Sequence, residues 1–173
     1  MRSGPLAQVV VAAGDDVVVQ SAVERLRRGG LVSPAESPVA AGHAAFAFDP
    51  RGTGEMTGCG VARNWAWLAG RPTVGMWALD IVQAARVCRR RLEARAVRVE
   101  ACGPFGWPAL LGGAALPGAV DAGVVLVPWA TQRQRLAAEG DAAVADVPGL
   151  LERLDVPQLR ALWPQVEVRV DRD

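Results

Sequence analysis

The sequence predicts an α/β fold for residues 1–173, a single domain in which helices cover both faces of a parallel sheet. Two patterns carry this prediction. Short apolar runs rich in β-branched residues recur along the chain, as is typical of strands buried on both faces. Between them lie segments in which apolar or small residues recur at helical spacing. With 173 residues, 51% of them hydrophobic, the chain is long and apolar enough to bury one sizeable core.

The first part of the chain is expected to form a strand, a helix and a second strand. The apolar run at residues 8–13 ends in Gly14 and two aspartates, which predicts a strand followed by a turn. Apolar residues then recur at helical spacing over residues 17–28, and Asp16 is suited to cap the start of that helix. Residues 43–49 form the next predicted strand, which a Pro-Arg-Gly turn ends.

The rest of the chain continues the alternation of helix and strand. Trp77, Ile81, Ala85 and Cys88 form one apolar stripe of a long helix predicted within residues 73–95. A break near Pro157 divides the last helical region into two pieces. The other predicted elements are strands at residues 97–102, 120–127 and 166–170 and helices at residues 107–116 and 148–163.

Composition argues against several classes of partner and cofactor. The formal net charge is +1, and the arginine-rich stretch at residues 86–98 has neither interleaved aromatic residues nor a nucleic-acid reading motif. No apolar run is long enough to predict a membrane span. Cys59, Cys88 and Cys102 are odd in number and lie at no metal-ligand spacing, which favours a reducing, cytoplasmic environment. We therefore expect no metal, no cofactor, no nucleic acid and no membrane among the partners.

A loop and the helix that follows it stand out together. Residues 48–55 read Phe-Asp-Pro-Arg-Gly-Thr-Gly-Glu, and residues 70–81 read Gly-Arg-Pro-Thr-Val-Gly-Met-Trp-Ala-Leu-Asp-Ile. They resemble the D-x-R-G-x-G-E loop and the next helix of α/β-hydrolases in the acetyl xylan esterase and prolyl-oligopeptidase-like branch. Residues 97–116 then resemble the strand, nucleophile elbow and helix of that fold. The resemblance begins at the family's third strand and implies a partial α/β-hydrolase fold without the usual N-terminal antiparallel strands.

The resemblance implies a catalytic serine at the elbow, but none is there. The elbow reads Cys-Gly-Pro-Phe-Gly-Trp, so either Pro104 or Phe105 holds the nucleophile position, depending on register. Neither side chain carries a nucleophilic atom. Cys102 is the nearest nucleophile, but it precedes the turn and is expected to be a buried structural thiol.

The other catalytic groups are also altered. The resemblance calls for a histidine after the elbow, whereas His43, the single histidine, lies far before it and is expected to be structural. Asp171, or as an alternative Asp173, matches the position of the triad acid or belongs to a charged tail. Gly14 and Asp15 match the oxyanion loop, where an acidic side chain would repel the developing charge.

Three hypotheses remain open at this stage. The first is an α/β-hydrolase-like protein without hydrolase activity, a pseudoenzyme. The second is an active esterase with a displaced nucleophile, either Cys102 or a loop serine, Ser33 or Ser37. The third is an interaction subunit, a homo- or hetero-oligomer formed through an exposed sheet edge.

Overall fold

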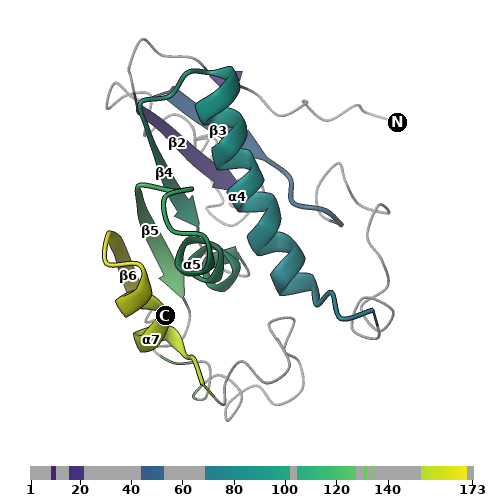
Figure 1. Ribbon diagram of the computed structural model, residues 1–173, viewed down its shortest axis with the longest axis vertical. Helices are drawn as coiled ribbons and strands as arrows, with labels where there is room; N and C mark the ends of the chain where they lie inside the picture. Colours follow the sequence, from purple (N-terminus) through teal and green to yellow (C-terminus); the bar gives the residue numbers. More distant parts are fainter. Residues whose placement is uncertain are drawn as a thin grey trace, which may run out of the picture.

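In the computed structural model of the protein, the described residues are 9–10, 16–21, 44–52, 69–101, 105–127, 131, 134 and 153–170. They form a mixed α/β structure (Figure 1). No helix within these ranges combines the length and the hydropathy needed to cross a bilayer. The strands are β1 (Val9–Val10), β2 (Asp16–Ser21), β3 (Ala44–Phe48), β4 (Ala96–Ala101), β5 (Ala122–Val127) and β6 (Val166–Val170), and the helices are α4 (Thr73–Arg91), α5 (Gly106–Ala115) and α7 (Val156–Leu162).

The described strands form one sheet in the order β1-β3-β2-β4-β5-β6. Every neighbouring pair from β3 to β6 is parallel, whereas β1 runs antiparallel to β3. After β2 the chain moves outward to β3, then crosses back over β2 to reach β4 and continues to β6. This reversal of direction is a topological switch point, and it lies between β2 and β4.

All three described helices pack on the same face of the sheet. Each helix follows a parallel strand and connects it to a strand nearer β6 in the sheet. Right-handed crossovers that run in the same direction along a sheet place their helices on the same face. Figure 1 shows α4 and α5 in front of the strands, and α5 contacts both α4 and α7. Val97, Val99 and Val125 are buried beneath them. On the other face, β4 and β6 carry charged side chains: Arg98, Glu100, Glu167 and Arg169.

A single tryptophan fastens α7 and β6 to the rest of the core. Trp163 ends α7, and its ring lies between Gly113 of α5 and Gly123 of β5. A Cβ added at Gly113 or Gly123 would come within 2.3 or 2.4 Å of that ring, so both positions need glycine for this packing. Asp155 caps the start of α7 in a capping box with Gln158.

Asp121 connects the last turn of α4 to the start of β4, at the end of the strand opposite the elbow. Its carboxylate accepts hydrogen bonds from the guanidinium of Arg89 and, at 2.7 Å, from the backbone N–H of Val97. Partial burial by itself raises the pKa of the Asp121 carboxyl, but these hydrogen bonds outweigh it and the pKa is lowered. The arginine-rich end of α4 therefore has a structural contact.

The predictions from the strand at residues 43–49 onward are confirmed within the described ranges. The predicted strands at residues 43–49, 97–102, 120–127 and 166–170 correspond to β3, β4, β5 and β6. The long helix within residues 73–95 is α4, and the helix after the elbow is α5. Only the second piece of the last predicted helix lies in the described part, where Pro157 occupies the first turn of α7.

Two predictions for the first strands of the sheet are wrong. Residues 16–21 form strand β2 where a helix was expected, so Asp16 begins a strand and caps no helix. The three consecutive β-branched residues Val17–Val19 favour an extended chain, and that preference outweighs the helical spacing that continues beyond them. Strand β1 lies within the strand predicted at residues 8–13, but it runs antiparallel to β3, whereas the predicted fold had no N-terminal antiparallel strand. The three described helices lie on one face of the sheet, and the expectation of helices on the other face stays a prediction for residues outside the described ranges.

Candidate functional site

The candidate site lies at the carboxyl end of the parallel strands. In open α/β sheets, ligands bind outside these ends near a switch point, because neighbouring loops leave in opposite directions there. The switch point lies between β2 and β4, and β4 is followed by residues 102–107, the segment that resembles a nucleophile elbow in the sequence and is called the elbow below. The loop after β3 and the first turns of α4 lie at the same end.

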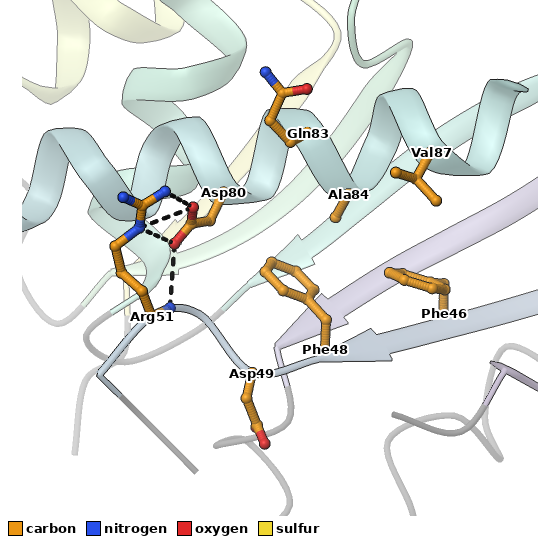
Figure 2. Close-up of a pocket in the computed structure, with 8 residues that line it drawn as sticks. All are labelled: Phe46, Phe48, Asp49, Arg51, Asp80, Gln83, Ala84 and Val87. Carbon is orange, nitrogen blue, oxygen red and sulfur yellow. Dashed lines mark hydrogen bonds and ion pairs between the residues drawn. The ribbon is translucent and has the colours of Figure 1, made fainter. Parts of the chain in front are cut away.

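Arginine 51 holds the loop after β3 against α4. Its Nε donates hydrogen bonds to both carboxylate oxygens of Asp80, at 2.8 and 3.0 Å, and its Nη2 donates to Oδ1 (Figure 2). The backbone N–H of Arg51 also donates to Asp80, at 3.1 Å. The hydrogen bonding to Asp80 raises the pKa of Arg51 above its ordinary value, against a smaller effect of burial. Asp80 thus binds both the side chain and the main chain of the loop.

Tryptophan 77 extends this contact to the elbow. Its indole Nε1 donates a 2.9 Å hydrogen bond to the carbonyl oxygen of Arg51. Its ring packs against that of Phe105, with centroids 4.9 Å apart and planes inclined at 53°. The two segments singled out in the sequence, residues 48–55 and 70–81, are therefore in contact through Arg51 and Trp77. Trp77 in turn packs against Phe105, the N-cap residue of α5.

At the elbow, Phe105 is a buried packing residue in a relaxed conformation. Its side chain is 1% exposed, and its backbone angles, φ −97° and ψ −11°, place it at the N-cap of α5. A strained nucleophile position would present its side chain to solvent at the tip of the turn. Trp107, two residues later, is also buried, at 4% exposure. The described part of the elbow is thus filled by aromatic rings.

Gly106 has a specific steric role in the elbow. A Cβ at this position would lie 2.2 Å from the carbonyl oxygen of Leu126 and 3.3 Å from Cγ1 of Val127. Only glycine lets the first turn of α5 approach β5 so closely. In the sequence, Gly106 is two positions after Pro104, which is the spacing between the nucleophile and the second glycine of the G-x-S-x-G pattern.

A groove of about 480 Å³ runs alongside this site, between α4 and β3. Figure 2 shows the rings of Phe46 and Phe48 pointing from β3 toward Ala84 and Val87 on α4, while Asp49 points away. The two phenylalanine rings stack with centroids 6.3 Å apart. At the polar end, the guanidinium of Arg51 is engaged by Asp80, so this end offers little free charge to an anion.

Most catalytic candidates from the sequence lie outside the described residues. This holds for Gly14, Asp15, Ser33, Ser37, His43, Cys59, Cys102, Pro104, Asp171 and Asp173. Of the residues in the elbow, Phe105, Gly106 and Trp107 are described. Cys88 is a free, fully buried thiol whose pKa burial raises to about 11, so it is a poor nucleophile near neutral pH.

Sequence reasoning missed the contacts that organise the site. The helical pattern assigned Trp77 to the apolar stripe and gave no role to Asp80. A signal for this contact was available in the sequence. Arg51 and Asp80 lie in the two segments that carry the resemblance, and a partly buried charge needs a partner of opposite sign.

Comparison of the sequence with models of known protein families gives no match, and comparison with curated proteins gives no significant match.

Proposed function

We propose that the chain has a partial α/β-hydrolase fold and is a non-catalytic, pseudoenzyme-like relative of ester hydrolases. The strand order supports the fold assignment, because an antiparallel strand at one edge and an elbow strand in the middle of the sheet resemble the α/β-hydrolase arrangement. The contact of the D-x-R-G loop with α4 supports it as well. Arg51, Asp80 and Trp77 join the two segments that carry the resemblance to the acetyl xylan esterase branch.

The observation that carries the proposed loss of activity is the close approach of Gly106 to β5. In a working elbow the nucleophile projects into the pocket and the next residue supplies a backbone N–H to the oxyanion. The Gly106 contact favours Pro104 as the nucleophile position and Phe105 as the donor position. Proline has no nucleophilic atom and restricts φ to about −65°, which is unsuited to a strained elbow. The rings of Phe105 and Trp107, which follow Pro104 in the sequence, are buried, and Trp77 packs against Phe105.

The remaining triad positions agree with this proposal on sequence grounds. The single histidine, His43, precedes the strand β3, whereas the base of an α/β-hydrolase follows the elbow. Asp171 remains the proposed remnant of the acid. We also assign the chain to the cytoplasm, and the buried, unpaired thiol of Cys88 is compatible with a reducing compartment.

Chemical labelling tests the proposal against an enzyme with a displaced nucleophile. A fluorophosphonate probe reacts with an activated serine and iodoacetamide with an activated thiolate. We expect no stoichiometric fluorophosphonate adduct, and we expect Cys102 to react with iodoacetamide no faster than a cysteine in a short peptide at the same pH. The matched control is the Cys102→Ala variant. An adduct on Ser33 or Ser37, or accelerated labelling that Cys102→Ala removes, would overturn the proposal.

One observation favours an interaction role for such a chain. In the described sheet, β6 is the last strand and has a hydrogen-bonded neighbour, β5, on one side. Strand edges of this kind pair readily with another chain. We propose that the protein acts through a homo- or hetero-oligomer, and the dependence of its sedimentation coefficient on concentration tests this. A monomer at every concentration, with and without cell extract, would contradict it.

A further inference from the structure

The edge strand β6 has a charge pattern that is complementary to itself. Its sequence is Val166-Glu167-Val168-Arg169-Val170, with one acidic and one basic residue on either side of a central valine. Glu167 and Arg169 are two residues apart, so they lie on the same face of the strand. Their side chains are 55% and 59% exposed, and the Arg169 Nε donates a 2.7 Å hydrogen bond to Glu167.

We infer that β6 pairs with β6 of a second copy of this chain, antiparallel and centred on Val168. In this register Glu167 of each copy lies directly opposite Arg169 of the other, and Val166 lies opposite Val170. The two-fold axis generates both charge pairs at once, because a symmetric interface repeats each contact. The described sheets of the two copies then join into one. This inference names the partner and the contact for the interaction role proposed above.

The opposite orientation of the two strands is disfavoured by the same charges. Parallel pairing in register would place Glu167 beside Glu167 and Arg169 beside Arg169, and like charges directly opposite one another destabilise a strand pair. The antiparallel arrangement also joins each new pair to the hydrogen-bonded Glu167–Arg169 pair within each chain. Four charges of alternating sign then form one cluster across the axis.

Exposed apolar side chains beside β6 add surface that a second copy can cover. Val170 is 39% exposed, and Leu162 at the end of the neighbouring helix α7 is 54% exposed. Because α7 lies on one face of the sheet, a two-fold axis perpendicular to the sheet brings the α7 helices of both copies to the same face. The apolar side chains near the axis and the paired charges on the opposite face therefore both stabilise the dimer.

Charge reversal tests the inference without a known ligand. The full chain is examined by sedimentation velocity over a range of concentrations. We expect a concentration-dependent dimer for the wild type. Glu167→Arg and Arg169→Glu each place like charges in opposition and should raise the dimer dissociation constant at least about tenfold, which corresponds to about 1.4 kcal/mol. The control is Arg91→Glu at the end of α4, which should leave the dimer unchanged.

Two further samples identify the register. The double variant Glu167→Arg/Arg169→Glu has an equally self-complementary edge and should dimerise like the wild type. A mixture of the two single variants should form a heterodimer, because one edge carries two positive charges and the other two negative ones. A wild type that stays monomeric overturns the inference, and so does a dimer that both single reversals leave intact. A dimer that both single reversals leave intact would still support the interaction role, but its contact would lie elsewhere than β6.

Discussion

Replacing Asp80 with asparagine tests whether the loop after β3 is held by α4. The carboxylate of Asp80 accepts from the backbone N–H of Arg51 at 3.1 Å and from its Nε at 2.8 and 3.0 Å. An asparagine keeps one oxygen but turns the other into an NH₂ group that faces a guanidinium. Hydrogen bonds to charged groups contribute about 1.5–3 kcal/mol each, and exposed ion pairs much less. Because the Arg51 side chain is 40% exposed, we expect a loss of about 2 kcal/mol in unfolding free energy.

The assay is thermal unfolding followed by circular dichroism, with urea unfolding as a second measurement. For a chain of this size, about 2 kcal/mol corresponds to a decrease of about 4–8 °C in Tm. The matched control is Glu100→Gln, which removes a carboxylate 3.5 Å from the Arg98 side chain on the charged face of the sheet and should leave Tm nearly unchanged. Equal Tm values for Asp80→Asn and Glu100→Gln would refute the claim that the Arg51–Asp80 contact holds the site together.

Three other substitutions test the packing and the electrostatics. Gly106→Ala places a Cβ 2.2 Å from a backbone oxygen and should lower the unfolding free energy by at least about 3 kcal/mol, whereas Gly75→Ala in α4 meets its nearest atom at 3.6 Å and should be neutral or stabilising in the same urea experiment. Trp163→Ala removes a buried ring and should cost about 3–5 kcal/mol, and a smaller loss would mean that α7 is not anchored by that ring. Asp121→Asn should destabilise by less than about 1 kcal/mol at pH 7. Since the folded-state pKa of Asp121 is lowered, its contribution is present above the ordinary aspartate pKa of about 4 and is lost as the pH falls through the folded value, so the wild-type and variant stabilities should converge in acid.

Local patterns were sufficient to predict most of the regular structure described. Val166–Val170 alternates apolar and charged residues and is a strand over that same range. The stripe formed by Trp77, Ile81, Ala85 and Cys88 is buried in α4, as helical spacing predicts. At Asp16–Ser21 two local signals conflicted, and the β-branched run determined the outcome because the neighbouring strands β3 and β4 pair with it on both sides.

The site was predictable in position but not in its contacts. The turn after β4 was placed at the carboxyl end of the sheet, and the structure starts α5 there. The sequence left Pro104 and Phe105 as alternatives for the nucleophile position. The choice between them depends on how closely Gly106 approaches Leu126, a contact between residues 20 positions apart that no local pattern reveals. The pairing of Arg51 with Asp80 is likewise a tertiary contact.

Ester hydrolysis by the purified chain is the most direct test of the central claim that the elbow has no working nucleophile. The measurement is turnover of p-nitrophenyl acetate by the wild type, Cys102→Ala and His43→Ala at the same protein concentration and pH. We predict that all three show the same slow background release, without saturation. Saturable turnover by the wild type that either substitution abolishes would contradict the proposal that this chain is non-catalytic.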